Sequence, residues 1–186
     1  MVPSPYNPKK VRAALRVCLL AAQTVHARVA LTGGTALEAW GVARATQDVD
    51  LVFLLPSTRF SKLQQLLLER GARFLEVRTE AQIAWLRVLL YGVQIDWLRA
   101  WDLPTQRALR LSVIRSVLGM RLRVLRPEDL ILLKLRVGRP RDLDDAVRLY
   151  ALCRGQMDQP YLRRAVRQLR LGQEWTYLSR SLSQDI

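Results

Sequence analysis

Residues 31–37 read Leu-Thr-Gly-Gly-Thr-Ala-Leu, and residues 44–55 read Arg-Ala-Thr-Gln-Asp-Val-Asp-Leu-Val-Phe-Leu-Leu. The glycine pair opens a helix predicted over 35–41, and Asp48 and Asp50 enter an apolar strand predicted over 50–55. Because side chains alternate along a strand, both carboxylates point to the same face, which is unfavourable unless a cation lies between them. Glycines before a helix offer free backbone N–H groups to an anion. The stretch therefore indicates a nucleoside triphosphate bound with Mg²⁺.

A third carboxylate lies in the last of three successive predicted strands, at 72–78, 83–90 and 93–98. Val93, Ile95 and Trp97 take one face of that strand, and Asp96 takes the other. Two or three aspartates suffice for Mg²⁺ when substrate phosphates complete its shell, and a two-metal site needs carboxylates that flank both ions. Asp96 is the candidate third ligand if its strand lies beside that of Asp48 and Asp50.

Each of these features has a commoner explanation when it is taken alone. An Asp-x-Asp pair usually marks a turn or a solvated strand end, a Gly-Gly pair before a helix is a weak signal, and a lone strand aspartate is usually a hydrogen-bonded residue. Their order and spacing, and the apolar strand after the acid pair, favour a site.

The composition adds a strong positive charge. The 186 residues include 30 Lys and Arg, 26 of them Arg, against 16 Asp and Glu, which gives a net charge of +14. Such a charge favours a polyanionic partner, first nucleic acid and second an acidic membrane surface. A GC-rich genome would also enrich Arg over Lys.

Other features concern compartment and metal type. No stretch approaches the ~20 apolar residues of a membrane span, and 1–10 lacks a signal-peptide core. Cys18 and Cys153 fit no metal-ligand spacing and are predicted to be reduced core residues of a cytoplasmic protein. The single histidine, His26, excludes most His-based metal sites.

The remaining pattern predicts one α/β core over 1–125 and a C-terminal helical subdomain over 126–186. Asn7-Pro8 begins an amphipathic helix over 8–27, and Ser57 or Thr58 caps a helix that runs to Gly71. The strand 83–90 is apolar on both faces and is predicted to be central. The other predicted elements are a strand at 29–32, a helix at 102–111, a hairpin at 113–117 and 121–125, helices at 127–138 and 141–153, and two helices within 159–182.

The two parts of the opening stretch resemble the signature of the DNA polymerase β-type nucleotidyltransferase superfamily. Within it, the chain is most similar to minimal AbiEii-type nucleotidyltransferases, which include toxins of toxin–antitoxin systems. The similarity extends to Lys134 followed by Arg-Asp-Leu-Asp-Asp over 141–145, and it covers about 29–150. It implies a mixed sheet flanked by helices, with three metal-binding carboxylates on adjacent strands.

The resemblance also implies roles for individual residues. Asp48 and Asp50 match the metal-binding pair, and Asp96 is the candidate third acid and general base. Gly33 and Gly34 match the phosphate-loop glycines, and Thr35 stands where many members have serine. Lys134 matches a lysine that neutralises the triphosphate, with a salt bridge to Asp142 or Asp145 as the alternative. Five further residues belong to the predicted site. Arg44 and Thr46 lie near the acids and are predicted to bind phosphate. Arg141, Asp142 and Asp145 are predicted either to order the helix pair or to contact the nucleotide.

The leading hypothesis is a Mg²⁺-dependent enzyme that transfers a nucleoside monophosphate from an NTP and releases pyrophosphate. The toxin resemblance implies tRNA as the acceptor and a cognate antitoxin as a partner. An antibiotic-modifying nucleotidyltransferase is an alternative, but a cationic aminoglycoside suits a chain of +14 poorly. A non-catalytic nucleotide- or RNA-binding module is a further alternative. A membrane-surface protein is the least favoured alternative, because the basic residues form no single amphipathic face.

Overall fold

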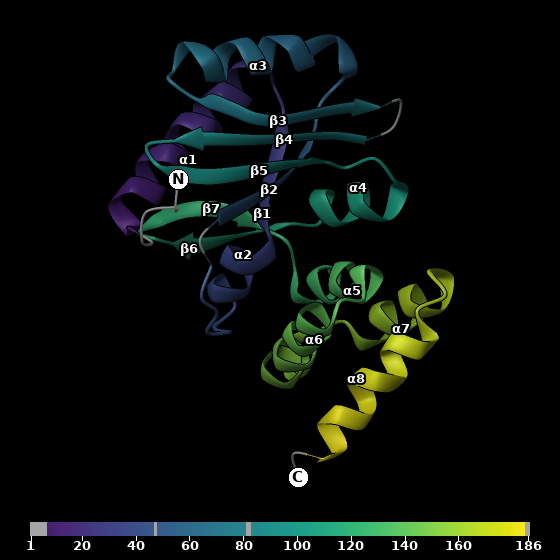
Figure 1. Ribbon diagram of the computed structural model, residues 1–186. Coiled ribbons are helices and arrows are strands. Elements are labelled where there is room, and N and C mark those ends of the chain that lie inside the picture. Colours follow the sequence, from purple (N-terminus) through teal and green to yellow (C-terminus); the bar gives the residue numbers. More distant parts are fainter. Residues whose placement is uncertain (1–6, 47, 81–82, 185–186) are drawn as a thin grey trace.

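A computed structural model describes residues 7–46, 48–80 and 83–184. In this part of the chain, seven strands form one mixed sheet in the order β3-β4-β5-β2-β1-β7-β6 (Figure 1). β2 is parallel to β5, β1 is parallel to β7, and the other neighbours are antiparallel. The strands are β1 Arg28–Thr32, β2 Asp48–Leu54, β3 Arg73–Glu80, β4 Ile83–Leu90, β5 Val93–Arg99, β6 Val113–Val117 and β7 Met120–Val124. The predicted α/β class with a mixed sheet is confirmed.

The helices follow the predicted order. They are α1 Pro8–Thr24, α2 Gly33–Ala39, α3 Phe60–Glu69, α4 Leu103–Arg110, α5 Pro127–Val137, α6 Pro140–Cys153, α7 Gln159–Gln168 and α8 Gly172–Gln184, with 3₁₀ turns at Ser57–Arg59 and Arg154–Gln156. The Asn7 side chain accepts hydrogen bonds from the N–H groups of Lys9 and Lys10, as a helix N-cap does. The predicted cap at Ser57 or Thr58 is wrong, because these residues form the 3₁₀ turn and α3 begins without a side-chain cap.

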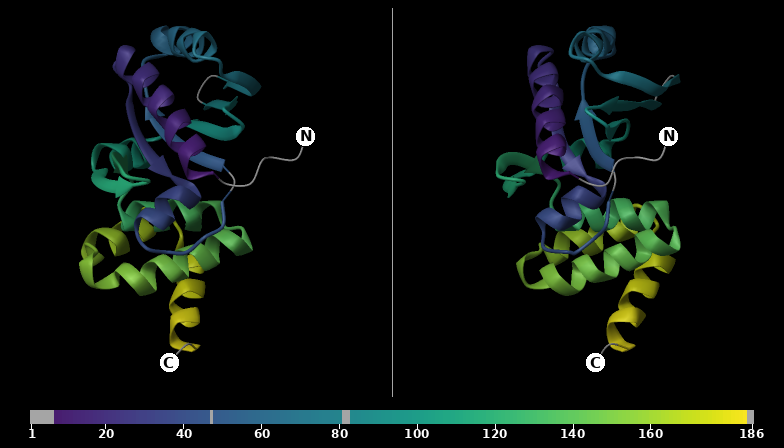
Figure 2. Two further views of the ribbon diagram at one scale, coloured as in Figure 1. Left: turned by 90° about the vertical axis from the view of Figure 1, so that its left-hand side faces the viewer. Right: turned by 60° about the vertical axis from the view of Figure 1, so that its left-hand side comes forward.

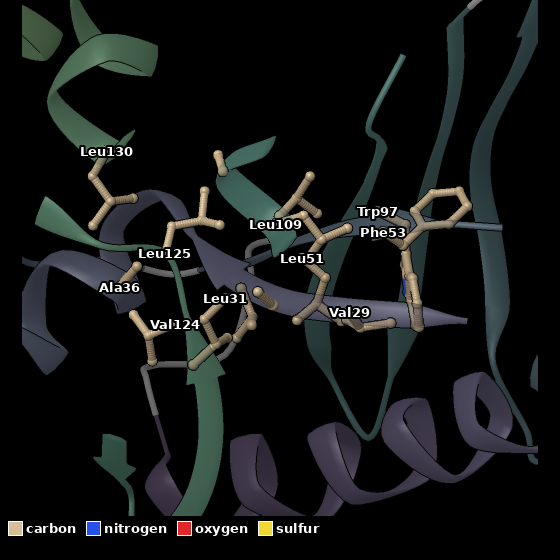
Figure 3. Packing of buried hydrophobic residues seen from close by; sticks show 14 of the residues in the cluster. Val29, Leu31, Ala36, Leu51, Phe53, Trp97, Leu109, Val124, Leu125 and Leu130 are labelled. Atoms are coloured by element: carbon tan, nitrogen blue, oxygen red, sulfur yellow. The ribbon is translucent and has the colours of Figure 1, made fainter. Parts of the chain in front are cut away.

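One face of the sheet is closed by α1 and α3 (Figure 1). The core fills this layer and continues to Ala36 of α2, Leu109 of α4 and Leu130 of α5 (Figure 3). Phe53 of β2 stacks on Phe60 of α3 at 6.0 Å and meets Trp97 of β5 edge-on at 5.8 Å. Trp97 and Cys18 of α1 are both fully buried in this core. Cys18 and Cys153 are buried free thiols, as expected.

The opposite face of the sheet is only partly covered, by α4, which contacts β1 and β2. In β4, Leu86, Val88 and Leu90 are buried toward the core, whereas Trp85 and Arg87 on the other face are partly exposed. β4 is an inner strand of the sheet, in agreement with the predicted central position, but its second face is only partly buried. β4 lies between β3 and β5, and its second face is free to line a cleft.

The helices α5 to α8 gather beyond one end of the sheet, and α8 extends away from it (Figures 1 and 2). α5 packs against α6, while α8 packs mainly on α6. The division at 125/126 matches this change from strands to helices but stays a prediction. Across the residues described, no helix combines the length and the apolar character that crossing a lipid bilayer requires.

Candidate active site

The three candidate metal-binding carboxylates lie on adjacent strands. β2 and β5 run parallel in a register that places Asp50 directly beside Asp96, with Asp48 two residues earlier on β2. All three side chains line one cleft of about 930 Å³. The condition set by the sequence, that the strand of Asp96 lies next to the acid pair, is met.

The glycine pair wraps around Asp50. Gly33 has φ +60°, and a Cβ atom there would lie 1.8 Å from Asp50 Oδ2. The Gly34 N–H lies close enough to Asp50 to lower the pKa of its carboxyl. A Cβ on Gly34 would lie 2.9 Å from the Thr46 side chain and 3.0 Å from that of Arg44. The glycines therefore serve the site in two ways, because they leave room for the acid and present backbone N–H groups to the cleft.

Asp50 lies where the negative charges accumulate. Burial, and then the neighbouring Asp48 and Asp96, raise the pKa of Asp50 to about 6, against the opposing effects of Lys134 and the Gly34 N–H. A bound cation would relieve this repulsion, because it favours the charged form of each carboxylate.

Asp48 is oriented by a neighbour in sequence. The hydroxyl of Thr46, which is largely buried, lies 2.7 Å from Asp48 Oδ1 and donates to it. This contact gives Thr46 a role in aiming a carboxylate. Thr46 also lines the cleft, and its contact with phosphate stays a prediction.

Asp96 is held by Arg87, which the sequence reading missed. Arg87 Nε and Nη2 donate to the two oxygens of Asp96 at 2.9 and 2.8 Å, and the guanidinium lies over the Trp85 ring at 4.5 Å. A signal was present, because a two-residue turn at Tyr91-Gly92 fixes the hairpin register that places Arg87 opposite Asp96.

Lys134 lies in the cleft with its charge already paired. Its Nζ donates to Asp142 Oδ1 at 2.6 Å and to Asp145 Oδ2 at 2.9 Å, so the salt-bridge alternative is realised in this structure. The same Nζ remains close enough to Asp50 to lower its pKa. Lys134 therefore lies between the helix pair α5–α6 and the acids, with 12% of its side chain exposed.

The surrounding basic residues connect α6 to the loop before β2. Arg44 forms an ion pair with Asp145 at 2.9 Å, and Arg141 Nη2 donates to the Ala45 carbonyl at 3.2 Å. Arg139, which the sequence reading did not select, pairs with Asp142 at 2.6 Å and also lines the cleft. The charges of Asp142 and Asp145 are thus largely neutralised by these cations. Their main role in this structure is to connect α6 to α5 and to the loop before β2.

Thr35 is placed differently from the other predicted site residues. It is fully buried in α2, does not line the cleft, and its hydroxyl has no hydrogen-bond partner among the described residues. This placement does not support the predicted contact between its hydroxyl and a triphosphate.

The donor set suits Mg²⁺ in its chemistry, since it consists of carboxylate oxygens crowded in one cleft. The arrangement is not yet that of a metal centre, because within the described ranges no three Asp, Glu, His or Cys side chains are arranged to hold one ion. Both Asp96 oxygens face Arg87. A metal bound through all three acids would therefore use the remaining lone pairs of Asp96 or displace Arg87.

Comparison with known proteins finds similarity of structure only. No family model and no curated protein matches the sequence. The antibiotic-resistance factor ANT(2'')-Ia superposes with a TM-score of 0.62 at 19% identity, covering 92% of this chain and 98% of its own. It has also been solved with adenylyl-2''-tobramycin. An antigenic nucleotidyltransferase-like protein from Paracoccidioides brasiliensis gives 0.55 at 19% identity, covering 97% and 95%. The lincosamide adenylyltransferase LnuA gives 0.53 at 16% identity, covering 75% and 96%. The fold is therefore that of the nucleotidyltransferases, as the resemblance implied.

Proposed function

We propose that this protein is a Mg²⁺-dependent nucleotidyltransferase that transfers a nucleoside monophosphate from an NTP to RNA and releases pyrophosphate. The observation that carries the proposal is the register of Asp50 beside Asp96, next to the Gly33-Gly34 backbone. Phosphoryl transfer depends mainly on positioning and on neutralising charge, and this cleft offers both.

Each group of residues takes a part in this scheme. Asp48, Asp50 and Asp96 would hold the metal ions, which neutralise charge on the attacking and leaving oxygens when bound. Asp96, once released by Arg87, accepts the proton of the attacking hydroxyl. The glycine N–H groups and Lys134, with Arg139 and Arg141 at the rim, bind the triphosphate. Thr46 keeps Asp48 aimed into the cleft.

The charge of the cleft favours an anionic acceptor. Its lining includes Arg44, Arg87, Lys134, Arg139 and Arg141 against four aspartates. Three of those aspartates would be neutralised further by bound metal, so little negative charge remains for a cationic acceptor. The chain as a whole carries +14, which suits RNA.

Modification of an antibiotic is the second candidate function, and the structural similarity to ANT(2'')-Ia over almost the whole chain favours it. The two candidates differ in the acceptor alone, because both use an NTP and the same acids. The basic cleft described above is the reason for placing RNA first.

A toxin role for the RNA-directed enzyme follows from the similarity to AbiEii-type sequences. In that case the acceptor is tRNA, and a cognate antitoxin neutralises the enzyme in the cytoplasm. Induced expression in bacteria should then arrest growth, and Asp48→Asn should relieve the arrest. Continued growth with active protein present would contradict the toxin role while leaving the transfer chemistry intact.

Transfer of label tests the proposal directly. The protein is incubated with Mg²⁺ and each of the four α-labelled NTPs, in parallel with total RNA, purified tRNA, tobramycin and lincomycin. Label is expected in RNA, strongest in tRNA, and absent with Asp48→Asn. Label only in an antibiotic would establish the second candidate. If Asp48→Asn transferred label as well as the wild type, the assignment of the acids would be wrong.

A further inference from the structure

A second hollow lies on the same sheet face as the acids. It encloses about 360 Å³ and is lined in part by Val52, Trp85 and Leu98. These residues follow or precede Asp50, Arg87 and Asp96 by two positions on the same strands, so they share the face of the acids. Two residues along a strand correspond to about 7 Å. The hollow is therefore a neighbour of the reacting centre.

A third hollow continues from the second over α4, α5 and α7. It encloses about 490 Å³ and shares Leu133 and Arg136 with the second. We call the two together the Trp101 groove, after the exposed tryptophan that lines the second hollow beside the shared Arg136. We define the groove by Trp85, Leu98, Trp101, Leu103, Arg110 and Arg136. The groove thus begins beside the acids and runs onto the helical part.

The groove combines exposed apolar rings with arginines. Trp101 is 50% exposed and Leu103 is 75% exposed, although both are large apolar side chains. The guanidinium of Arg136 lies 5.5 Å from the centre of the Trp101 ring and is held in place by an ion pair with Asp102. The exposed indole offers a flat apolar surface to a ligand, and the Asp102 carboxylate balances the charge of Arg136 beside it.

The balance of charge along the groove is positive. Arginines at four positions line it, namely Arg99, Arg107, Arg110 and Arg136. The acid among its lining residues, Asp129, is buried and bound by Arg126 at 3.0 Å and by the Tyr161 hydroxyl at 2.6 Å. A ligand with repeated negative charges therefore meets arginine along this path without an exposed carboxylate from Asp129.

We infer that the Trp101 groove binds the single-stranded 3′ end of the RNA acceptor, with a base stacked on Trp101 and phosphates on the arginines. A positive groove with aromatic platforms is what single-stranded nucleic acid requires, because bases stack on the rings and the backbone follows the charge. In a duplex the bases are stacked on one another and not available to Trp101. The inference rests on the proposed RNA acceptor, and it adds where the acceptor lies.

The test measures binding without catalysis. A fluorescein-labelled single-stranded oligoribonucleotide of eight residues is titrated with protein in EDTA, without NTP, and its anisotropy is followed. Trp101→Ala should weaken binding by about 5- to 100-fold, the range expected for loss of a stacked base. Trp101→Phe should restore most of the affinity. The matched control is Tyr177→Ala, an exposed aromatic of α8 that should leave binding unchanged.

The contribution of the arginines is tested through the dependence of RNA affinity on salt concentration. Arg110→Gln should lower the slope of log affinity against log salt by about 0.7, the value for one phosphate contact to a single strand. Arg16→Gln, which removes the same charge from an exposed position on α1, should change the slope less. Equal slopes for the two variants would contradict the path along the groove.

The outcomes separate this inference from the proposed function. Label transfer to RNA with no change of acceptor KM in Trp101→Ala would contradict RNA binding in the Trp101 groove. The proposed nucleotidyltransferase function would be unaffected. Oligonucleotide binding that depends on Trp101, without any label transfer, would support RNA binding in the Trp101 groove and contradict the proposed enzymatic function. Oligonucleotide binding insensitive to Trp101 in a folded variant would reject RNA there and assign the exposed apolar surface to a protein partner.

Discussion

At the residue scale, Asp50 is the point at which the site is most constrained. Its carboxylate fits against Gly33, lies near the Gly34 N–H and is in register with Asp96. The protein therefore keeps a buried charge beside two like charges in the absence of metal. Such an arrangement costs stability and is retained where a ligand uses it.

Asp50→Asn should stabilise the metal-free protein at pH 7.5. The folded state keeps the Asp50 proton up to about pH 6, whereas the ordinary value is 3.8. The charge therefore costs stability above pH 6, by about 3 kcal/mol, and the cost disappears as the pH falls toward 4. Urea unfolding in EDTA should give a larger free energy of unfolding for Asp50→Asn than for the wild type at pH 7.5. The difference between the two should be smaller at pH 4.5.

The control for this measurement is Asp144→Asn, which changes an exposed carboxylate of α6. It should show no comparable dependence on pH. An Asp50→Asn difference of the same size at both pH values would contradict the account of a strained carboxylate.

Gly33→Ala should damage fold and site together. Two separate costs arise, one from φ +60° and one from the 1.8 Å approach of Asp50 Oδ2 to the new Cβ. Gly92→Ala carries the first cost alone, because Gly92 has φ +79° and open space around its Cβ position. We expect Gly92→Ala to lose about 1 kcal/mol of unfolding free energy and Gly33→Ala about 3 kcal/mol, by urea unfolding. Equal losses would mean that Asp50 moves aside freely.

Arg87→Gln should make the protein more responsive to Mg²⁺. Arg87 competes for both oxygens of Asp96, so its removal frees a metal ligand while leaving that ligand without its partner. The melting temperature should fall without metal, and the Mg²⁺ concentration for half-maximal stabilisation with a non-hydrolysable NTP should fall several-fold. Arg78→Gln is the control, since Arg78 also lies over Trp85, at 5.7 Å, but pairs with Glu76. An unchanged Mg²⁺ response in Arg87→Gln would exclude competition for Asp96.

At the element scale, the pair α5–α6 owes its orientation to buried charges as well as apolar packing. Lys134 of α5 meets Asp142 and Asp145 of α6, and Arg44 carries the connection to the loop before β2. The glycine pair, the acids and Lys134 come from four different elements. Their relative placement therefore depends on this junction.

Lys134→Met should destabilise the protein strongly. The change leaves two buried carboxylates with one cation each, Arg139 for Asp142 and Arg44 for Asp145. Breaking a buried pair in this way costs about 3 kcal/mol. Lys62→Met, an exposed lysine of α3, should cost far less in the same urea experiment. A small loss for Lys134→Met would show that its charge serves the ligand alone.

At the scale of the whole molecule, the charge of +14 opposes compactness. Arginines lie on the sheet, in the cleft and along the Trp101 groove, so self-repulsion is spread over the structure. A polyanion bound across these surfaces removes that repulsion. Stability and RNA binding are thereby linked through the same charge.

Raising KCl from 0.02 to 0.3 M should therefore increase the melting temperature, by an amount equivalent to about 1 kcal/mol. Calorimetry or circular dichroism without RNA measures the change. Exchanging Arg12 and Arg16, both exposed on α1, for glutamate should flatten the dependence, because each exchange lowers the net charge by two. A fall in stability with salt would show that surface ion pairs outweigh the repulsion.

Local patterns in the sequence determined the elements and the faces of their residues. The alternation of apolar and polar residues showed that Asp48 and Asp50 share one face of their strand and that Asp96 and Trp97 lie on opposite faces of theirs. This follows because successive side chains of a strand point to opposite faces. The glycine pair, the order of strands and helices, and the Asn7 cap were predictable for the same reason. The Tyr91-Gly92 turn even fixed the pairing of Arg87 with Asp96, although the prediction did not use it.

Only the tertiary structure decided which elements meet. The parallel register of β2 and β5 places Asp50 beside Asp96, although the chain between them includes two other strands and a helix. The burial of Thr35, the pairing of Lys134 and the Trp101 groove likewise depend on packing between elements distant in sequence. Short-range periodicity determines where a side chain points, whereas its partner depends on the packing of the whole core.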